Sequence, residues 1–235
     1  MQRQQQVKIP TKQNRKRRTL SAVALMGLFS VVGATSMTAK AVTINVTDES
    51  GQPVNGAVVW FEGSQLTKQN AVTQLDYKMG QRDRAFTPHI LVVPKGAQVS
   101  FPNYDSILHH VYSFSAAQPF EFKLYRDNPQ ALTFANTGVV ELGCNIHDWM
   151  LGYILVVDST HFAITNDQGV AEVALAKPFA QDITINVWHE GFANLDQPES
   201  MTMAKIKTNQ TLTYQLNQSL FKPKEDFSDE FDDYE

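Results

Sequence analysis

The sequence contains a single cysteine, Cys144, among 235 residues. One cysteine excludes an internal disulfide, so the fold is not a small scaffold held together by disulfide bridges. The chain also has no glycine-rich phosphate loop, no G-x-S-x-G motif and no pair of carboxylates arranged for acid–base catalysis. No long amphipathic helical pattern is evident. These absences argue against the common enzyme classes and leave the lone cysteine to be explained.

Acidic residues are missing from the first 41 positions, which carry eight lysines and arginines. An apolar run over 20–34 follows the basic stretch, and Ala39 and Ala41 supply small residues where a signal peptidase cleaves. The run is too short for a comfortable membrane span. We therefore expect residues 1–41 to be a secretory signal peptide and the protein to reach the periplasm. An uncleaved anchor and twin-arginine export through Arg17-Arg18 are alternatives.

The region after the predicted signal is strongly acidic. Residues 42–235 hold 12 basic and 24 acidic side chains, a net charge of −12. This balance argues against nucleic acid as a partner and favours basic or neutral protein surfaces. The length of residues 42–235 suffices for one large or two small domains. The last residues, 219–235, are rich in acids and are expected to be a disordered tail.

Short alternating stretches bounded by turn residues recur along the chain. The predicted strands are 42–47, 57–61, 89–93, 98–101, 109–114, 131–134, 139–144, 152–157, 162–175 (as strand, turn and strand), 182–191 and 211–216. Regular spacing of this kind is typical of sandwiches and barrels. The sequence therefore predicts an all-β fold.

A cluster of metal-binding residue types surrounds the lone cysteine. The stretch from Cys144 through His147 to Met150 puts a thiolate, an imidazole and a thioether on one short loop, and His109 supplies a second imidazole earlier. Two histidines, one cysteine and a weak axial methionine are the ligand set of a type 1 (blue) copper centre. Metal binding also explains a free thiol in an exported protein, for which a buried inert cysteine is the alternative.

Residues 69–158 resemble the cupredoxins, the family of plastocyanin, azurin and amicyanin. The similarity lies in the stretches 86–88, 91–96 and 99–103, in the spacing of the 144–150 loop, which matches the amicyanin loop, and in the strand after Met150. The resemblance implies a Greek-key β-sandwich that binds one copper ion and passes single electrons. It also implies that the edge of His147 is the point of electron entry.

The choice between His109 and His110 stays open at this stage. The cupredoxins place an asparagine six residues before their first copper histidine, and Asn103 has this spacing to His109. The family usually has asparagine after that histidine, where this chain has His110. His110 falls on the opposite face of the strand. The resemblance thus favours His109 as the ligand, with His110 as a replacement or a supporting group.

The flanking segments resemble another family. Residues 42–68 and 159–218 are similar to a carboxypeptidase-regulatory-like β-sandwich with an Ig-like fold. The implied organisation is one discontinuous sandwich with the cupredoxin domain, 69–158, inserted at a loop. The combination of both modules also resembles bacterial proteins labelled methylamine-utilisation proteins.

These features predict a periplasmic copper protein that is not an enzyme, because three strong ligands and an axial methionine leave no position for a substrate. Its expected partner is an unidentified redox protein, soluble or membrane-bound. A copper-delivery protein without a redox role and a β-sandwich interaction module are the alternatives. Met79, Gln81 and His89 are candidates for a second copper site or for contacts to the first, with an ordinary strand and a surface histidine as the alternative.

Overall fold

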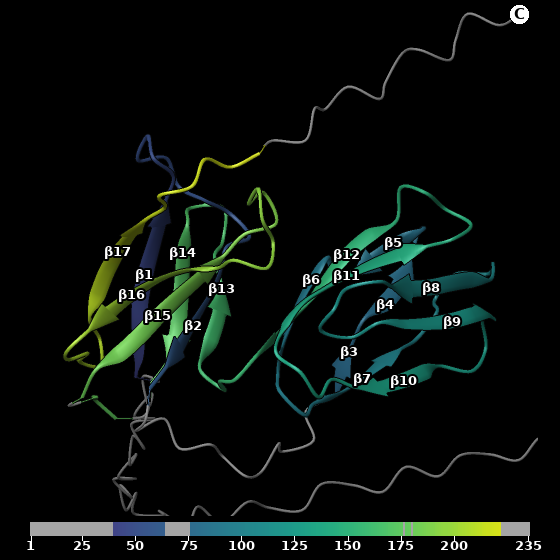
Figure 1. Ribbon diagram of the computed structural model, residues 1–235, viewed down its shortest axis with the longest axis horizontal. Coiled ribbons are helices and arrows are strands. Elements are labelled where there is room, and N and C mark those ends of the chain that lie inside the picture. The colour runs from purple at the N-terminus through teal and green to yellow at the C-terminus, as the bar shows by residue number, and fades with distance from the viewer. Residues whose placement is uncertain (1–39, 64–75, 176, 180, 222–235) are drawn as a thin grey trace, which may run out of the picture. The chain divides into compact units, whose positions relative to one another are not determined.

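The structure, a computed structural model, describes residues 40–63, 76–175, 177–179 and 181–221. Within these ranges it contains strands and no helix, which confirms the all-β prediction (Figure 1). No helix long and apolar enough to cross a membrane occurs in this part of the chain. The predicted signal peptide up to residue 39 and the tail from residue 222 lie outside the described residues.

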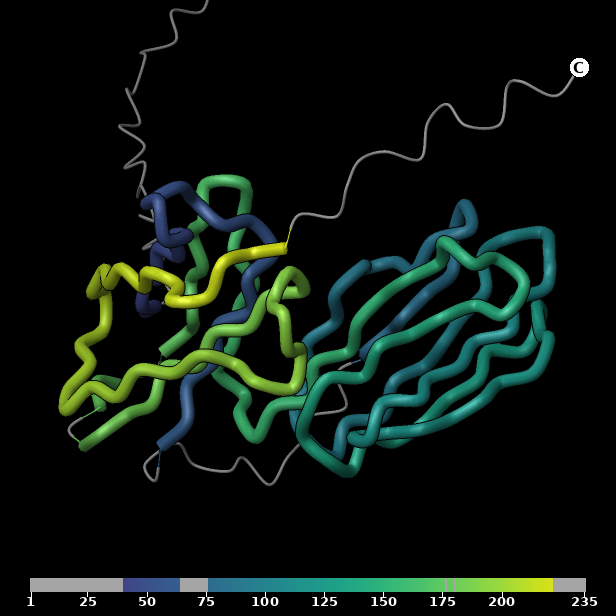
Figure 2. Tube along the Cα trace, turned by 45° about the horizontal axis from the view of Figure 1, so that its top comes forward, coloured from purple at the N-terminus to yellow at the C-terminus, as the bar shows by residue number. Residues whose placement is uncertain are grey.

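Two sheets are built from the N-terminal and C-terminal parts of the described chain. One has the order β14-β1-β17, and the other has the order β13-β2-β15-β16. Their strands are β1 (Ala41–Thr47), β2 (Val58–Glu62), β13 (Phe162–Ile164), β14 (Val170–Ala174), β15 (Ile183–Trp188), β16 (Glu199–Met203) and β17 (Thr211–Gln215). The first and last strands, β1 and β17, pair in parallel, so the purple and yellow-green strands of the chain lie side by side (Figure 2).

The middle of the chain supplies the remaining sheets. They have the orders β6-β12-β11-β8-β9 and β10-β7-β3, with a separate β4-β5 hairpin. Their strands are β3 (Tyr77–Lys78), β4 (Gly80–Arg82), β5 (Ala85–Thr87), β6 (Ile90–Pro94), β7 (Gln98–Phe101), β8 (His109–Ser113), β9 (Phe120–Tyr125), β10 (Gln130–Thr133), β11 (Gly138–Cys144) and β12 (Leu151–Val157).

The predicted strands are confirmed with small shifts at their ends, whereas β3, β4, β5, β9 and β16 were not predicted. Each sheet draws its strands from only one of the two sequence regions expected to form separate sandwiches. The described residues between 40 and 221 nevertheless belong to one compact unit. The division into an inserted and a discontinuous domain therefore remains a prediction.

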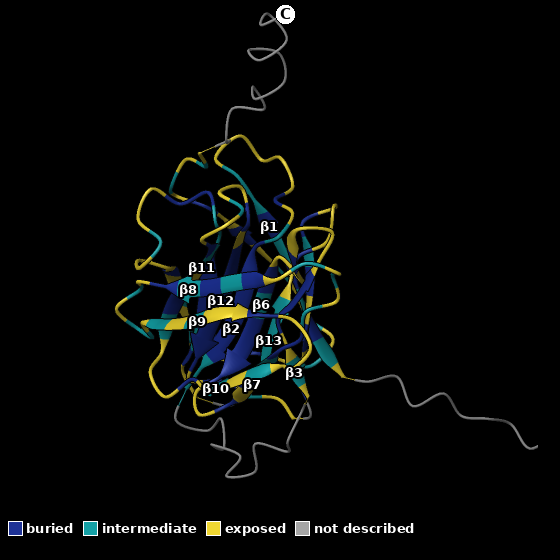
Figure 3. Cartoon of the chain, turned by 90° about the vertical axis from the view of Figure 1, so that its right-hand side faces the viewer, coloured by how far each residue is buried: buried dark blue, intermediate teal, exposed yellow. Residues whose placement is uncertain are grey.

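Strand β12 is buried on both faces. Ile154 and Val156 belong to a core cluster with Cys144, whereas Tyr153 and Leu155 belong to the core cluster of the sheets around β1 and β2. A strand covered on both sides is expected to read as a continuous apolar run, as β12 does. Buried positions run along the inner strands, and exposed ones gather in the loops and on outer strands such as β9 (Figure 3). The strand that follows the cysteine loop therefore has a rigid support.

The β4-β5 hairpin turns through two residues with left-handed backbone. Asp83 has φ 54° and Arg84 has φ 57°. Two-residue hairpin turns with both central residues at positive φ match the twist of the strands and usually contain Asn-Gly. Side chains other than glycine cost ~1–2 kcal/mol each in this conformation. Contacts around the turn must therefore offset this cost.

Candidate metal centre

The predicted ligands come from neighbouring ends of paired strands. His109 is the first residue of β8 and Cys144 is the last residue of β11. The strands are antiparallel, with Cys144 opposite Val111, so the start of β8 lies beside the end of β11. His147 and Met150 follow in the connecting loop. There the N–H of His147 donates to the carbonyl of Cys144 (3.3 Å), and that of Met150 donates to the carbonyl of His147 (3.0 Å).

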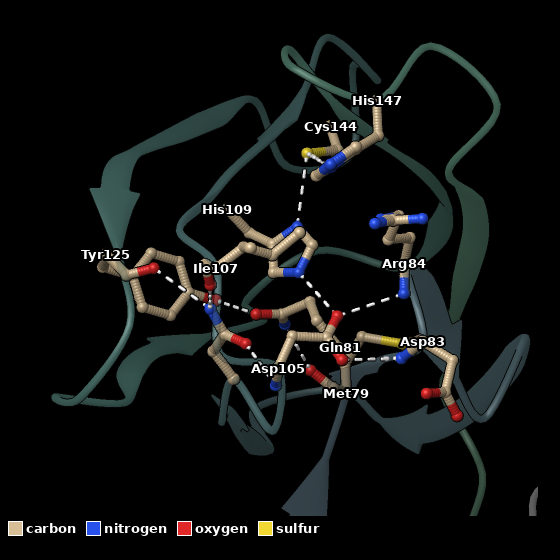
Figure 4. A network of polar contacts seen from close by, with 11 residues as sticks. Met79, Gln81, Asp83, Arg84, Asp105, Ile107, His109, Tyr125, Cys144 and His147 are labelled. Carbon is tan, nitrogen blue, oxygen red and sulfur yellow. Dashed lines mark hydrogen bonds and ion pairs between the residues drawn. The ribbon is translucent and has the colours of Figure 1, made fainter.

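Three donor side chains converge at this end of the sheet (Figure 4). Sγ of Cys144 lies 3.7 Å from Nδ1 of His109 and 3.5 Å from Nδ1 of His147. The three ligand atoms all lie within 4.8 Å of one another. An ion about 2.0–2.3 Å from each donor, with angles of about 110–120°, separates nitrogen and sulfur by about 3.5–3.8 Å. The spacing therefore fits a single ion held by all three side chains.

The two donors on strands are shielded from water. His109 is 0% exposed and Cys144 is 2% exposed, whereas His147 is only partly buried. Met150 is buried in the same core cluster as Cys144. The structure thus brings His109, Cys144 and His147 together and places Met150 in the same core cluster as the cysteine.

His109 has a defined partner on its other ring nitrogen. Its Nε2 lies 2.9 Å from Oδ2 of Asp105. An ionised carboxylate only accepts hydrogen bonds, so Nε2 is the protonated nitrogen and donates. In the neutral ring, Nδ1 then carries the free lone pair, and this is the nitrogen that faces Sγ of Cys144. The ring is therefore in the tautomer that a metal at the predicted site requires.

Asp105 is in turn held by the strained turn. Its Oδ1 accepts the N–H of Asp83 at 2.7 Å, and its Oδ2 accepts the N–H of Arg84 at 3.1 Å. Burial raises the pKa of the Asp105 carboxyl, but the N–H of Arg84, the imidazole of His109 and the N–H of Asp83 outweigh it and lower that pKa. Asp105 is therefore a carboxylate at neutral pH.

The loop around His147 carries exposed apolar side chains. Ile146 is 46% exposed, Trp149 is 68% exposed and Leu151 is 42% exposed. The ring centroids of His147 and Trp149 are 5.4 Å apart. Desolvation lowers the pKa of His147, and the positive charge of Arg84 lowers it further. The imidazole is therefore favoured in its neutral form, the form that binds metal.

His110 lies apart from the donor group. Its Nε2 is 2.8 Å from Oε1 of Glu121 on the neighbouring strand β9. His109, and not His110, belongs to the group of converging ligand atoms. The geometry thus places His109, and not His110, with Cys144 and His147.

The candidates for a second copper site have other contacts. Met79 is fully buried in the core cluster with Cys144. Gln81 donates from Nε2 to the carbonyl of Met79 (3.1 Å) and accepts from the hydroxyl of Tyr125 (2.7 Å). Nε2 of His89 lies 2.6 Å from Oε2 of Glu190. Among the described residues, neither Gln81 nor His89 has an arrangement that calls for a metal.

The pair of His89 and Glu190 predicts a pH-dependent contribution to stability. Its hydrogen bond raises the pKa of His89 above 6.5, and the same bond lowers the pKa of Glu190 below 4.5. The stabilisation that His89 contributes is complete below pH 6.5 and is lost as the pH rises through the pKa of His89 in the folded protein. The stabilisation that Glu190 contributes is complete above pH 4.5 and is lost as the pH falls through the pKa of Glu190 in the folded protein.

We expect Glu190→Gln to lower the free energy of unfolding by at most about 1 kcal/mol near pH 5.5, because both side chains are partly exposed and screened. The loss should shrink at about pH 8.5, because His89 loses its charge as the pH rises through its raised pKa. Urea unfolding of both proteins at the two pH values measures the difference. An equal loss at both would contradict the ion pair.

Sequence patterns missed the residues behind His109. Asp105, Asp83 and Arg84 had no role assigned from the sequence. The four-residue spacing from Asp105 to His109 was the available signal. The contacts from Asp83 and Arg84 to Asp105 span 22 and 21 residues, so no local sequence pattern predicts them.

Comparisons with known proteins find similarity in structure only. No family model matches the chain, and no curated protein matches its sequence. A Cu-containing nitrite reductase (NirK) from Thermus scotoductus SA-01 is similar over 35% of this chain and 22% of its own, with 24% identity and a TM-score of 0.34. The chain thus spans about a fifth of the length of that enzyme.

Two smaller proteins are similar over the same share of the chain. A mutant of amicyanin, in its reduced Cu(I) form at pH 4, shares 20% identity over 35% of this chain and 82% of its own, with a TM-score of 0.32. A purple cupredoxin from Nitrosopumilus maritimus shares 22% identity over 35% of this chain and 100% of its own, also with a TM-score of 0.32. These similarities leave about two thirds of the chain without a counterpart.

Proposed function

We propose that His109, Cys144, His147 and Met150 hold one copper ion in a type 1 centre and that the protein carries single electrons between redox partners. The observation that carries the proposal is the convergence of two imidazoles and a buried thiol within 4.8 Å. Thiolate and thioether sulfur favour Cu(I), whereas imidazole also suits Cu(II). Copper bound by this mixed set would supply one-electron chemistry with little rearrangement of its ligands.

The chain's own contribution is to hold the donors in place. His109 and Cys144 sit at the ends of strands that pair with each other, and Asp105 orients the His109 ring. The burial of Cys144 keeps water and oxidants away from the thiolate. Donors on rigid elements keep their geometry when the charge of the site changes. This rigidity supports electron transfer over copper delivery, for which a ligand must release the ion.

The partner is expected to approach His147. Its partly exposed ring lies beside the exposed apolar side chains of Ile146 and Trp149, a suitable surface for a small and transient contact. The net charge of −12 over residues 42–235 would steer a basic region of the partner toward the protein at low salt. We propose the periplasm as the compartment, from the predicted signal peptide.

Absorption spectroscopy with metal analysis tests the proposal. Protein loaded with Cu(II) is expected to bind one copper per chain and to show an intense visible thiolate-to-Cu(II) band. The band should bleach with a reductant and return with an oxidant. Colourless binding of Cu(I) without a stable Cu(II) form would instead favour copper delivery. The absence of stoichiometric copper would contradict both functions.

The role of Met150 has a separate test. Met150→Gln is expected to retain copper and its colour, because the three strong donors remain, and to lower the reduction potential, because an amide oxygen is a harder donor than a thioether. Protein-film voltammetry measures the potential. The buried Met79, which lies in the same core cluster but outside the cysteine loop, gives the control Met79→Leu. An unchanged potential in Met150→Gln would show that Met150 is not the axial ligand.

A further inference from the structure

We infer that Asp105, held by the Asp83-Arg84 turn, is a positioning residue that fixes the ring of His109 and lowers the reduction potential of the site. The inference rests on the proposed function for its redox part, whereas its positioning part concerns the protein without metal. The evidence is a chain of contacts that runs from the β4-β5 turn through a carboxylate to a fully buried imidazole (Figure 4).

The carboxylate of Asp105 accepts three hydrogen bonds, which hold it in one orientation. Oδ1 accepts from the Asp83 N–H, and Oδ2 accepts from both the Arg84 N–H and His109 Nε2. The backbone N–H of Asp105 donates to Oδ1 of Asn103 at 2.8 Å. Successive N–H groups in a turn with positive φ form a concave site for an anion. The side chain that fills this site is therefore held in place independently of His109.

Asn103 joins the same arrangement from the other side. Its Nδ2 donates to the carbonyls of Ile107 at 2.9 Å and Tyr125 at 3.2 Å. These bonds close the loop between Asn103 and His109 and tie it to strand β9. Both ends of the 103–109 segment are therefore fixed, and Asp105 cannot follow His109 if the ring moves.

Two consequences follow for the metal site. The acceptor on Nε2 selects the tautomer with a free Nδ1, so the ligand is prepared before a metal arrives. The negative charge of Asp105 also favours the more positive of two metal oxidation states, here Cu(II) over Cu(I). A type 1 site that is backed by a carboxylate should therefore have a lower potential than the same site without the charge.

A structural role alone would give different results. Asp105 could serve only to cap the Asp83-Arg84 turn, in which case its removal would loosen the turn and leave the His109 tautomer and the potential unchanged. The substitutions Asp105→Asn and Asp105→Ala separate these roles. Asparagine keeps an oxygen that accepts from His109 and loses the charge, whereas alanine loses both. Arg84→Gly keeps the backbone N–H and relieves the left-handed conformation.

The first experiment uses the full chain without metal. Histidine ¹⁵N NMR at about pH 7.5 is expected to show His109 wholly as the Nε2–H tautomer in the unmodified protein, in Asp105→Asn and in Arg84→Gly. Asp105→Ala should show a mixture of tautomers, because no acceptor remains. Retention of the pure tautomer in Asp105→Ala would overturn the positioning role, whether or not the protein binds copper.

The second experiment measures the copper-loaded proteins. Asp105→Asn is expected to weaken Cu(II) binding about tenfold more than Cu(I) binding, which raises the potential by about 59 mV. Asp148→Asn is the matched control, since it removes one negative charge from the exposed cysteine loop, and it should shift the potential much less. Equal shifts in the two variants would overturn the redox part. Failure of every protein to bind copper would instead contradict the proposed function, and the tautomer result would still stand.

Discussion

Replacing Cys144 by serine is expected to abolish the visible absorption of the copper-loaded protein completely. The band arises from charge transfer between the thiolate and Cu(II), and Cys144 is the chain's only thiol. A hydroxyl of similar size can still contact Nδ1 of His109, so the metal-free variant should lose only about 1 kcal/mol of stability. Visible absorption, circular dichroism and urea unfolding measure colour and folding together.

Ser113→Ala is the control for this substitution. Ser113 is a small residue, 2% exposed, at the other end of the strand that carries His109. Its removal disturbs a buried polar group of the same sheet without touching the ligands, so the colour should persist. A coloured Cys144→Ser protein would show that the thiolate is not a ligand. Loss of colour in both variants would point to a general loss of sheet structure.

Removing His109 should greatly weaken Cu(II) binding, whereas removing its neighbour His110 should not. His109→Ala is expected to reduce Cu(II) affinity by more than about 100-fold, since even an outer partner of a ligand is worth about 10–100-fold. His110→Ala should leave the affinity within about twofold. It removes a contact with Glu121, whose side chain is 55% exposed, and an edge-to-face ring contact with Tyr112, so stability should change by no more than about 1 kcal/mol.

The comparison needs a second ligand variant, because His109 is fully buried and its truncation can cost about 2–5 kcal/mol. His147→Ala serves this purpose, since its ring is partly exposed and its removal leaves no large cavity. Isothermal titration with Cu(II) measures all three variants. Equal affinity in His109→Ala and the unmodified protein, or a large loss in His110→Ala, would reverse the ligand assignment.

The sequence predicted the donors better than their environment. Cys144, His147 and Met150 are close in sequence, so one loop pattern reveals them. His109 was reached through the Asn103 spacing, and the structure places it with Cys144 and His147. The partner of His109 could not be predicted in the same way. Its position depends on how a distant turn meets the 103–109 loop.

The turn itself was hidden by its composition. Hairpins with two residues at positive φ usually contain Asn-Gly at the turn, whereas this one contains Asp83 and Arg84. Arg84 in particular is no turn signal, so β4 and β5 were not expected. The anion that fills the turn, Asp105, explains how such residues are tolerated. Tertiary contact here overrides local preference.

Two further strands were missed for opposite reasons. Strand β9, Phe120–Tyr125, has a regular signal, because Phe120 and Phe122 alternate with charged residues and pack against Phe101 in the core. That alternation was sufficient to predict it. Strand β16, Glu199–Met203, has a weaker signal, because only Met201 and Met203 alternate with polar residues and both are only partly buried. It forms because it pairs along β15, which is a nonlocal cause that a single sequence does not show.

X-ray absorption at the copper K-edge tests the central claim most directly. In protein loaded with one equivalent of Cu(II), the account predicts a first shell of one sulfur at short distance and two imidazole nitrogens. The same ligands should remain after reduction to Cu(I), with only small changes in distance. A first shell of nitrogen and oxygen atoms without sulfur would contradict the assignment of Cys144, and with it the proposed electron-transfer function.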